Sequence, residues 1–164
     1  MVLRDKILEE GAEVPSPWGT FLIRGHAAGL TRLDFPGDFK APWKPASESL
    51  HEAAERLKRY FEGGQRDFYD LTFDLSQKSP FAQKVLKHLA ASGPRECLTY
   101  TELASRAGVC RAARAVGNVM RENDLPIFIA CHRVLASGGR FGGYSKGLVW
   151  KRRFLELEGI SVCF

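Results

Sequence analysis

The sequence has few cysteines, and it lacks any long apolar run. Its four cysteines, among 164 residues, stand singly at no regular spacing, which argues against a disulfide framework and for a reducing environment. No second Cys or His lies at ligand spacing, so we expect no metal site. No stretch approaches the roughly 18 apolar residues of a membrane span, and the N-terminus lacks the apolar segment of a signal peptide. We therefore expect a cytoplasmic protein, or a nuclear one in a eukaryote, with no membrane partner.

Charge is distributed unevenly along the chain. Residues 1–75 hold 10 Lys and Arg against 13 Asp and Glu, a net charge of −3, whereas residues 76–164 hold 14 against 6, a net charge of +8; together they give the +5 of the chain. A basic half predicts a polyanionic partner such as nucleic acid, although a solvated basic face without a partner is the alternative. The polar segment 76–80 divides the chain into two expected domains, 1–75 and 76–164.

The first domain has the pattern of an α/β fold. A turn at 16–19 precedes an expected strand at 20–26, and a second turn leads to an alternating strand at 30–35, which together predict a hairpin. A loop with three prolines follows at 36–45. Either Ser47 or Ser49 is expected to cap an amphipathic helix that stops at Gly63-Gly64, and Glu52 would complete a capping box with Ser49. The segment 68–75 is expected to form a short strand.

The second domain is expected to be mostly helical. Ser79 is a candidate cap for a helix at 81–89, and Thr99, with Glu102 three residues later, forms a capping box for a short helix ending at 107–108. A small-residue helix at 111–123 follows, with arginines at 111 and 114 expected one turn apart. Helix, glycine-containing turn and basic helix are typical of a helix-turn-helix. Close helix packing is the alternative explanation for the small residues.

The most informative stretch is residues 127–134, where an apolar run ends in Cys131 and His132. We expect a partly buried strand or turn, and a chemically inert cysteine would also be compatible with such a place. A reactive cysteine needs a base, because the thiolate is the nucleophile, and His132 is the candidate. Neighbours on an extended chain point to opposite faces, so a turn or a bridging water would have to connect them. Glu158, in the last turn of a helix expected at 148–158, is disfavoured there by the helix dipole and should have another partner.

These motifs together resemble the O6-alkylguanine-DNA alkyltransferases, the methylated-DNA–protein-cysteine methyltransferases. The resemblance is close over about residues 79–160 and looser over 15–75. It rests on Tyr100, Ala112-Ala113-Arg114-Ala115-Val116-Gly117, Asn123, Cys131-His132-Arg133-Val134, Gly143-Tyr144-Ser145 and Leu155-Glu156-Leu157-Glu158-Gly159, in that order and at that spacing.

The resemblance implies an RNase-H-like α/β N-terminal domain and a mostly α, winged-helix-like C-terminal domain that binds DNA. It implies irreversible, single-turnover transfer of the alkyl group from O6-alkylguanine, and possibly O4-alkylthymine, to Cys131. The partner would be double-stranded DNA with its damaged base flipped out, and the protein would act as a monomer. No cofactor is implied, because the alkyl group is its own electrophile.

The family's functional residues carry over to matching positions of this sequence. Cys131 would be the nucleophile, His132 would take its proton through a water, Glu158 would hold the imidazole, Tyr100 would rotate the base and donate a proton toward it, and Asn123 would bond the backbone near Cys131. Arg114 would fill the space that the base leaves. Further DNA contacts would come from Tyr100, Arg111, Ala113, Ala115 and Ser137, and the base pocket from Met120, Val134, Tyr144, Ser145 and Lys151.

The sequence departs from the family pattern at Ala130, where a proline usually precedes the cysteine, and at Lys146, where a small residue is common. Alanine frees a φ angle and an N–H that proline would restrict, so the pose of Cys131 could differ. The main alternative function is an alkyltransferase-like protein that binds lesions without transfer, but such relatives replace the cysteine. A cysteine hydrolase or an unrelated helix-turn-helix regulator is a third reading.

Overall fold

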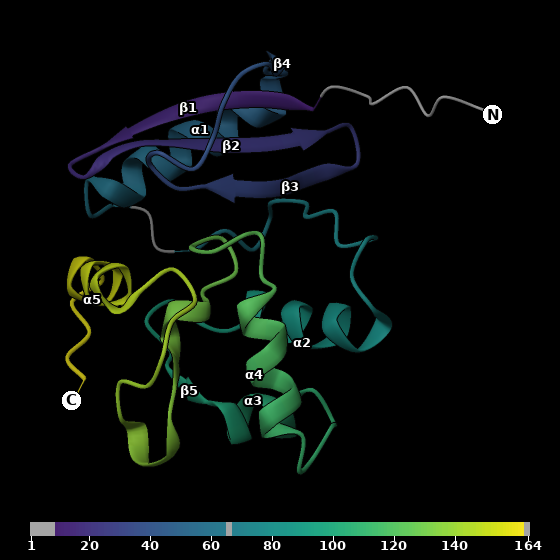
Figure 1. Cartoon of the computed structure of the whole chain (residues 1–164), viewed down its shortest axis with the longest axis vertical. Helices are drawn as coiled ribbons and strands as arrows, with labels where there is room; N and C mark the ends of the chain where they lie inside the picture. The colour runs from purple at the N-terminus through teal and green to yellow at the C-terminus, as the bar shows by residue number, and fades with distance from the viewer. Residues whose placement is uncertain (1–8, 65–66, 163–164) are drawn as a thin grey trace. The chain divides into compact units, whose positions relative to one another are not determined.

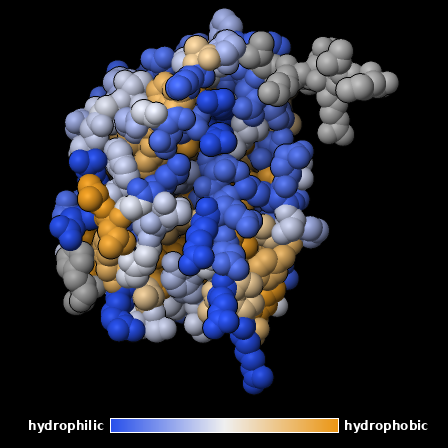
Figure 2. Space-filling view, in the orientation of Figure 1, coloured by the Kyte–Doolittle hydropathy of each residue, from blue (hydrophilic) through white to orange (hydrophobic). Residues whose placement is uncertain are grey.

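The computed structural model describes residues 9–64 and 67–162, which divide into two compact units. The first comprises residues up to 65 together with Leu71–Asp74, and the second comprises Arg66–Asp70 together with the chain from Leu75 onward. In the described residues, the longest helices fall short of the length and apolarity that crossing a membrane requires. The face drawn in Figure 2 is mostly hydrophilic, with hydrophobic residues in small separate groups.

The first unit is a four-stranded mixed sheet with one helix packed on it (Figure 1). The strand order is β3-β2-β1-β4, in which β1, β2 and β3 are antiparallel neighbours and β4 runs parallel to β1. Phe21 lies at the centre of its core, with ring centroids 5.0 Å from Phe35 and 4.8 Å from Phe61. The elements are β1 (Glu10–Ser16), β2 (Gly19–His26), β3 (Gly29–Asp34), β4 (Lys44–Pro45) and α1 (Glu48–Phe61).

The expected hairpin is confirmed, but no pattern in the sequence indicated β1. Gly11 and Pro15 dilute its β propensity, and only Gly11 and Val14 of β1 are buried. The strand forms because it pairs with β2 along its whole length, from Glu10↔Gly25 to Ser16↔Gly19. Gly11 is required there, since an added Cβ would lie 2.5 Å from the Trp43 ring. Tertiary pairing, rather than local propensity, therefore makes this strand.

Two local predictions in the first domain are wrong. The helix α1 begins at Glu48, and Ser47, one of the two expected caps, is its N-cap residue, although its side chain makes no capping bond. Ser49 lies inside the helix, so the box of Ser49 with Glu52 does not form. The segment 68–75 is not a strand: Phe73 makes one isolated bridge to Leu30. The chain passes from one unit to the other and back here, and Phe68 packs against Phe128 at 4.9 Å. The segment therefore cannot pair continuously with one sheet.

The second unit is mostly helical, with a short parallel pair of strands, β5 and β6. Both predicted caps are confirmed: the Ser79 hydroxyl accepts from the Ala82 N–H at 3.2 Å, and Thr99 and Glu102 form the reciprocal capping box. Its elements are α2 (Pro80–Ala90), β5 (Leu98–Thr99), α3 (Tyr100–Arg106), α4 (Ala113–Arg121), the 3-10 turn η1 (Cys131–Arg133), β6 (Val134–Leu135), the 3-10 turn η2 (Ser137–Gly139) and α5 (Leu148–Leu157).

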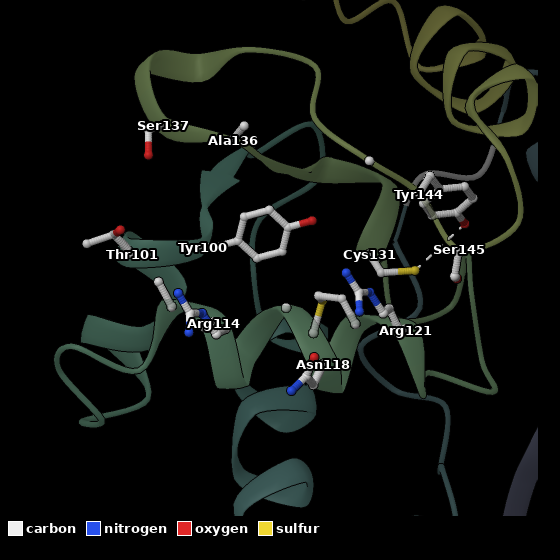
Figure 3. A pocket seen from close by; sticks show the side chains of 14 residues that line it. Tyr100, Thr101, Arg114, Asn118, Arg121, Cys131, Ala136, Ser137, Tyr144 and Ser145 are labelled. Atoms are coloured by element: carbon white, nitrogen blue, oxygen red, sulfur yellow. Dashed lines mark hydrogen bonds between the residues drawn. The ribbon is translucent and has the colours of Figure 1, made fainter.

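The expected helix at 111–123 is shorter than predicted, because α4 spans Ala113–Arg121. Arg111 lies before it with a left-handed φ of 66°, so Arg111 and Arg114 are not one turn apart on one helix. A left-handed residue cannot continue a right-handed helix. The α3–turn–α4 arrangement itself is present, and α4 runs alongside the loops that carry Cys131 and Tyr144 (Figures 1 and 3).

Candidate active site

Cys131 opens the 3-10 turn η1, after a buried segment without regular secondary structure. The expected strand or turn is therefore a turn, and it is fully buried: Cys131 is 5% exposed. The Cys131 N–H donates to the Ile129 carbonyl at 2.7 Å across Ala130, whose φ of −71° and ψ of 63° are those of an inverse γ-turn. This tight turn replaces the extended geometry that would send the Cys131 and His132 side chains to opposite faces.

The Cys131 thiol has polar neighbours despite its burial. Its Sγ donates to the Tyr144 hydroxyl at 3.7 Å, and burial raises the pKa of the thiol, an effect that hydrogen bonds from Asn123 and Tyr144 oppose. Asn123 also holds the backbone that leads into the turn at two points: its Nδ2 donates to the Ile129 carbonyl at 2.9 Å, and its Oδ1 accepts from the Leu125 N–H at 3.0 Å. The free protein therefore holds Cys131 as a thiol.

His132 and Glu158 form a buried pair behind Cys131. His132 Nε2 lies 2.7 Å from Glu158 Oε1, and the two residues are 0% and 1% exposed. Burial lowers the pKa of His132, and the Glu158 carboxylate opposes this only in part. Because a carboxylate can only accept, Nε2 carries the hydrogen and Nδ1 keeps its lone pair. Among the described residues, none is hydrogen-bonded to Nδ1.

Arg133 is a residue of this site that the sequence interpretation missed. Its Nε donates to Glu158 Oε2 at 2.7 Å, and its Nη2 donates to Oε1 at 3.0 Å, so the guanidinium grips both carboxylate oxygens. Burial alone would raise the pKa of Glu158, but the contacts with His132 and Arg133 outweigh it and hold the pKa at about 2. The sequence did hold an indication of this contact. An acid at a helix C-terminus is stabilised by a cation, and Arg133 directly follows His132, the partner expected for Glu158.

The Cys131 sulfur opens onto a pocket of about 970 Å³. Figure 3 shows the Tyr100 ring and the Cys131 sulfur facing the same space over α4, with Arg114 at one end and Tyr144 and Ser145 at the other. Met120, Ala113 and Ser137 also line it, as the sequence analysis expected. The wall residues that the sequence analysis did not single out are Thr101, Gly117, Asn118, Arg121, Ala136 and Gly143.

Four residues expected at the pocket or the DNA surface do not line this pocket: Val134, Lys151, Arg111 and Ala115. Val134 and Lys151 are both 0% exposed. The Lys151 Nζ donates to the carbonyls of Val134, at 2.8 Å, and Gly143, at 3.1 Å, and burial lowers its pKa to about 8. Lys151 therefore braces the pocket wall from behind rather than touching its contents.

Metal-ligating side chains do not cluster in the parts of the chain that the structure describes. Over residues 9–64 and 67–162, no three His, Cys, Asp or Glu side chains gather as a metal site would need. Cys97 is half-buried and Cys110 is exposed, while Cys163 lies outside the described residues. At the candidate site, the Cys131 thiol lines the pocket, and the His132 imidazole and the Glu158 carboxylate are buried behind it.

Comparison with known proteins identifies the family. The ribonuclease-like domain of 6-O-methylguanine DNA methyltransferase matches residues 12–75, and the DNA binding domain of the same family matches residues 80–160. The methylated-DNA–protein-cysteine methyltransferase of Methanosarcina barkeri is 37% identical over 150 residues, which cover 88% of this chain and 94% of that protein. The Bacillus subtilis constitutive enzyme of that name is 33% identical over 156 residues, covering 89% and 93%.

Solved structures agree with this match. The Mycobacterium tuberculosis protein OGT, solved in complex with DNA, is 34% identical, superposes with a TM-score of 0.79, and the match covers 91% of this chain and 92% of that one. The methyltransferase of the archaeon Pyrococcus kodakaraensis, at 23% identity and a TM-score of 0.70, shares the fold. The chain belongs to the 6-O-methylguanine DNA methyltransferase family, with its ribonuclease-like domain followed by its DNA-binding domain.

Proposed function

We propose that this protein repairs DNA by moving the alkyl group of O6-alkylguanine onto Cys131, once per molecule. The observation that carries the proposal is the Cys131 sulfur at the wall of a pocket large enough for a nucleobase, with the buried His132–Glu158 pair behind it. A guanine O6 inside the duplex is out of reach of a buried thiol, so the base must leave the stack and enter the pocket.

The transfer is a single nucleophilic displacement at the alkyl carbon, in which bonds, electrons and protons balance. The Cys131 thiol gives its proton, through a bridging water, to Nδ1 of His132, and the Glu158 carboxylate stabilises the imidazolium that forms. The thiolate then attacks the alkyl carbon; a C–S bond forms as the C–O6 bond breaks, and the bonding electrons leave with the guanine. The guanine takes a proton from the Tyr100 hydroxyl. The proton held by His132 then returns through water to the Tyr100 phenolate, so both side chains end neutral and the protein is left with a stable thioether.

The DNA contacts are proposed for the outer rim of this pocket. Arg114 is exposed at the beginning of α4, where its side chain would occupy the space of the flipped base. Tyr100 would press on the adjacent phosphate. Ala113, Ala115, Arg111 and Ser137 would contact the backbone, since small residues let a helix approach the groove closely. Net charge of +8 beyond residue 75 favours this side of the chain for a polyanion.

We further infer a two-domain architecture divided near residues 75 and 76, with a monomer as the acting form. The family matches, which end at 75 and begin again at 80, support this division. A winged-helix-like second domain is supported by α3, the turn and α4, followed by β6 and the isolated Ala136↔Arg140 bridge. An RNase-H-like first domain is supported by its mixed sheet, three strands of which are antiparallel, with α1 packed on it.

Intact mass spectrometry tests the function. After incubation with a duplex that holds one O6-methylguanine, we expect a gain of about 14 Da, the mass of one CH₂ unit, limited to one event per molecule. The Cys131→Ser chain should show no gain. Tight lesion-dependent binding without any gain would instead identify a lesion-flagging protein, and neither gain nor binding would contradict both functions.

A further inference from the structure

The Arg133–Glu158 ion pair is almost completely buried, and the transfer chemistry described above assigns Arg133 no role. The Arg133 side chain is 5% exposed and the Glu158 side chain 1%. Taking a carboxylate out of water is costly unless a cation or a proton compensates it. An arginine is charged at every accessible pH and matches a carboxylate with two parallel N–H donors. Glu158 therefore has a compensating charge that does not depend on pH.

His132 competes for the same carboxylate. It lies 2.7 Å from Oε1, the oxygen that Arg133 Nη2 also contacts at 3.0 Å. A buried Glu–His pair without a cation can compensate its charge by binding one proton, on either partner. With that proton bound, either His132 is an imidazolium that cannot take another proton, or Glu158 is neutral and no longer stabilises one. Both states remove the base that Cys131 needs.

We propose that Arg133 is a positioning residue that, by neutralising Glu158, keeps the His132–Glu158 pair from binding an extra proton at neutral pH, so that Nδ1 of His132 stays free to accept the Cys131 proton. The inference rests on the proposed function and deepens it. Arg133 does not line the pocket; its guanidinium donates to Glu158 and to the Gly93 carbonyl, and it acts on the proton transfer through Glu158.

The other charged and titratable groups around the His132–Glu158 pair either disfavour protonation of His132, as Arg133 does, or carry no charge near the carboxylate. Lys151 in α5, like Arg133, disfavours the imidazolium form of His132, but it lies against the backbone carbonyls of Val134 and Gly143 rather than against the carboxylate. On the other faces, Phe154 packs its ring 5.4 Å from the His132 ring and carries no charge. From other segments, the charge of Arg133 acts on the Cys97 thiol and the Tyr69 hydroxyl, and the charge of Glu158 acts on Cys97.

Arg133 also makes a hydrogen bond to a loop, and the effect of losing this bond must be distinguished from the effect of losing the charge. Its Nη1 donates to the Gly93 carbonyl at 3.4 Å. In the same loop, Arg95 Nη2 donates to the Gly159 carbonyl at 2.9 Å, at the end of α5. The loop before β5 is thus linked to the Glu158 region by two arginines, of which only Arg133 reaches the carboxylate. Arg95→Gln is therefore a matched control for the loss of loop anchoring.

The experiment compares the pH dependence of the single-turnover transfer rate for the unmodified chain, Arg133→Gln, Arg133→Lys and Arg95→Gln. For Arg133→Gln, we expect the acid limb of the rate profile to move upward by about one to three pH units, the usual effect of one nearby opposite charge. Arg133→Lys retains the charge and should restore most of the shift. Arg95→Gln should leave the limb in place. Equal slowing of Arg133→Gln at every pH, without a shift, would overturn the proposal.

A second readout does not require DNA. The imidazole NMR signals of His132, identified with a His132→Gln chain among the four histidines, should titrate at higher pH in Arg133→Gln than in the unmodified protein. If Arg133→Gln does not fold, Arg133→Lys and the doubly neutral Arg133→Gln/Glu158→Gln chain take its place. A small rise in the titration pH of His132 in Arg133→Lys, with no rise in the doubly neutral chain, would support the proposal. Identical titration of His132 in both chains would overturn it. If the protein transfers no alkyl group, the proposed function is contradicted. The titration of His132 still tests the effect of Arg133 on proton binding by the His132–Glu158 pair.

Discussion

At the scale of single residues, the backbone conformation of Ala130 sets the position and orientation of Cys131, the proposed nucleophile. The family pattern expected proline there, which left the pose of Cys131 in doubt. In the structure Ala130 has a φ of −71°, within the range that proline imposes. Among the described residues, no backbone carbonyl accepts a hydrogen bond from the Ala130 N–H. Alanine thus reaches the conformation that proline would enforce, because the γ-turn bond from Cys131 to Ile129 holds it.

Ala130→Pro should therefore stabilise the protein without changing the site. Proline removes conformational freedom from the unfolded chain, and at a compatible position this is worth about 0.4–1 kcal/mol. Chemical denaturation measures the gain. Ala136→Pro is the matched control: Ala136 has a similar φ of −72°, but its N–H donates to the Arg140 carbonyl at 2.9 Å. It should destabilise, and a loss of stability in both chains would refute the argument.

Residue chemistry was predictable from the sequence where residues are neighbours in the chain or match the family motif, and not where a contact is distant and outside that motif. Cys131 and His132 were recognised from their adjacency, and Glu158 from its unfavourable helix end. The grip of Arg133 on Glu158 was not, since 25 residues separate them. Which of the two adjacent side chains, His132 or Arg133, would turn toward Glu158 depends on backbone geometry; in the structure both do.

At the scale of elements, α5 supports the pocket wall through Lys151. The Nζ joins β6, at the Val134 carbonyl, to the glycine-rich loop, at the Gly143 carbonyl. Tyr144 and Ser145, which line the pocket, directly follow Gly143. A loop so rich in glycine has high conformational entropy of its own, so its order depends on this bond to a helix rather than on local propensity.

Lys151→Met should loosen this loop. Methionine keeps the length of the side chain but leaves the two carbonyls without their donor, which costs about 1–3 kcal/mol in stability. Amide hydrogen exchange should become faster over residues 142–146, and alkyl transfer should slow with it. The exposed Lys87 on α2 gives the control, because Lys87→Met should change neither. Unaltered exchange in Lys151→Met would show that the loop is held by other contacts.

Elements were predictable where capping chemistry and apolar periodicity agree. Ser79 and the box of Thr99 with Glu102 marked the beginnings of α2 and α3 correctly. Prediction failed where an element exists only through tertiary pairing, as in β1, or where a strand-like pattern of alternating residues serves two different units, as at 68–75.

At the scale of the whole molecule, the asymmetry of charge predicts how DNA is approached. The +8 of residues 76–164 favours binding through phosphates, and such binding releases counterions. The affinity for an undamaged duplex should therefore fall linearly with salt on logarithmic axes. Fluorescence anisotropy at several salt concentrations measures the slope, which reports how many phosphates the protein neutralises.

Arg111→Gln should reduce this slope by about one, as expected for the loss of one phosphate contact. The prediction holds although Arg111 lies outside α4, because the residue is exposed at the turn that leads into that helix. Lys58→Gln, an exposed change of the same charge in α1 of the acidic half, should leave the slope unaltered. An equal reduction in both chains would mean that net charge, rather than a located contact, governs binding.

The sequence by itself determined the family and the helical order of the second domain, and it indicated Cys131 and His132 as the proposed nucleophile and base, because these depend on residue type and spacing along the chain. Only the tertiary structure decided the rest: the pairing that creates β1, the withdrawal of Lys151 behind the pocket wall, and the closure of Arg133, His132 and Glu158 into one buried cluster. Such contacts join residues far apart in the chain, and their energies depend on burial, which no local pattern reports.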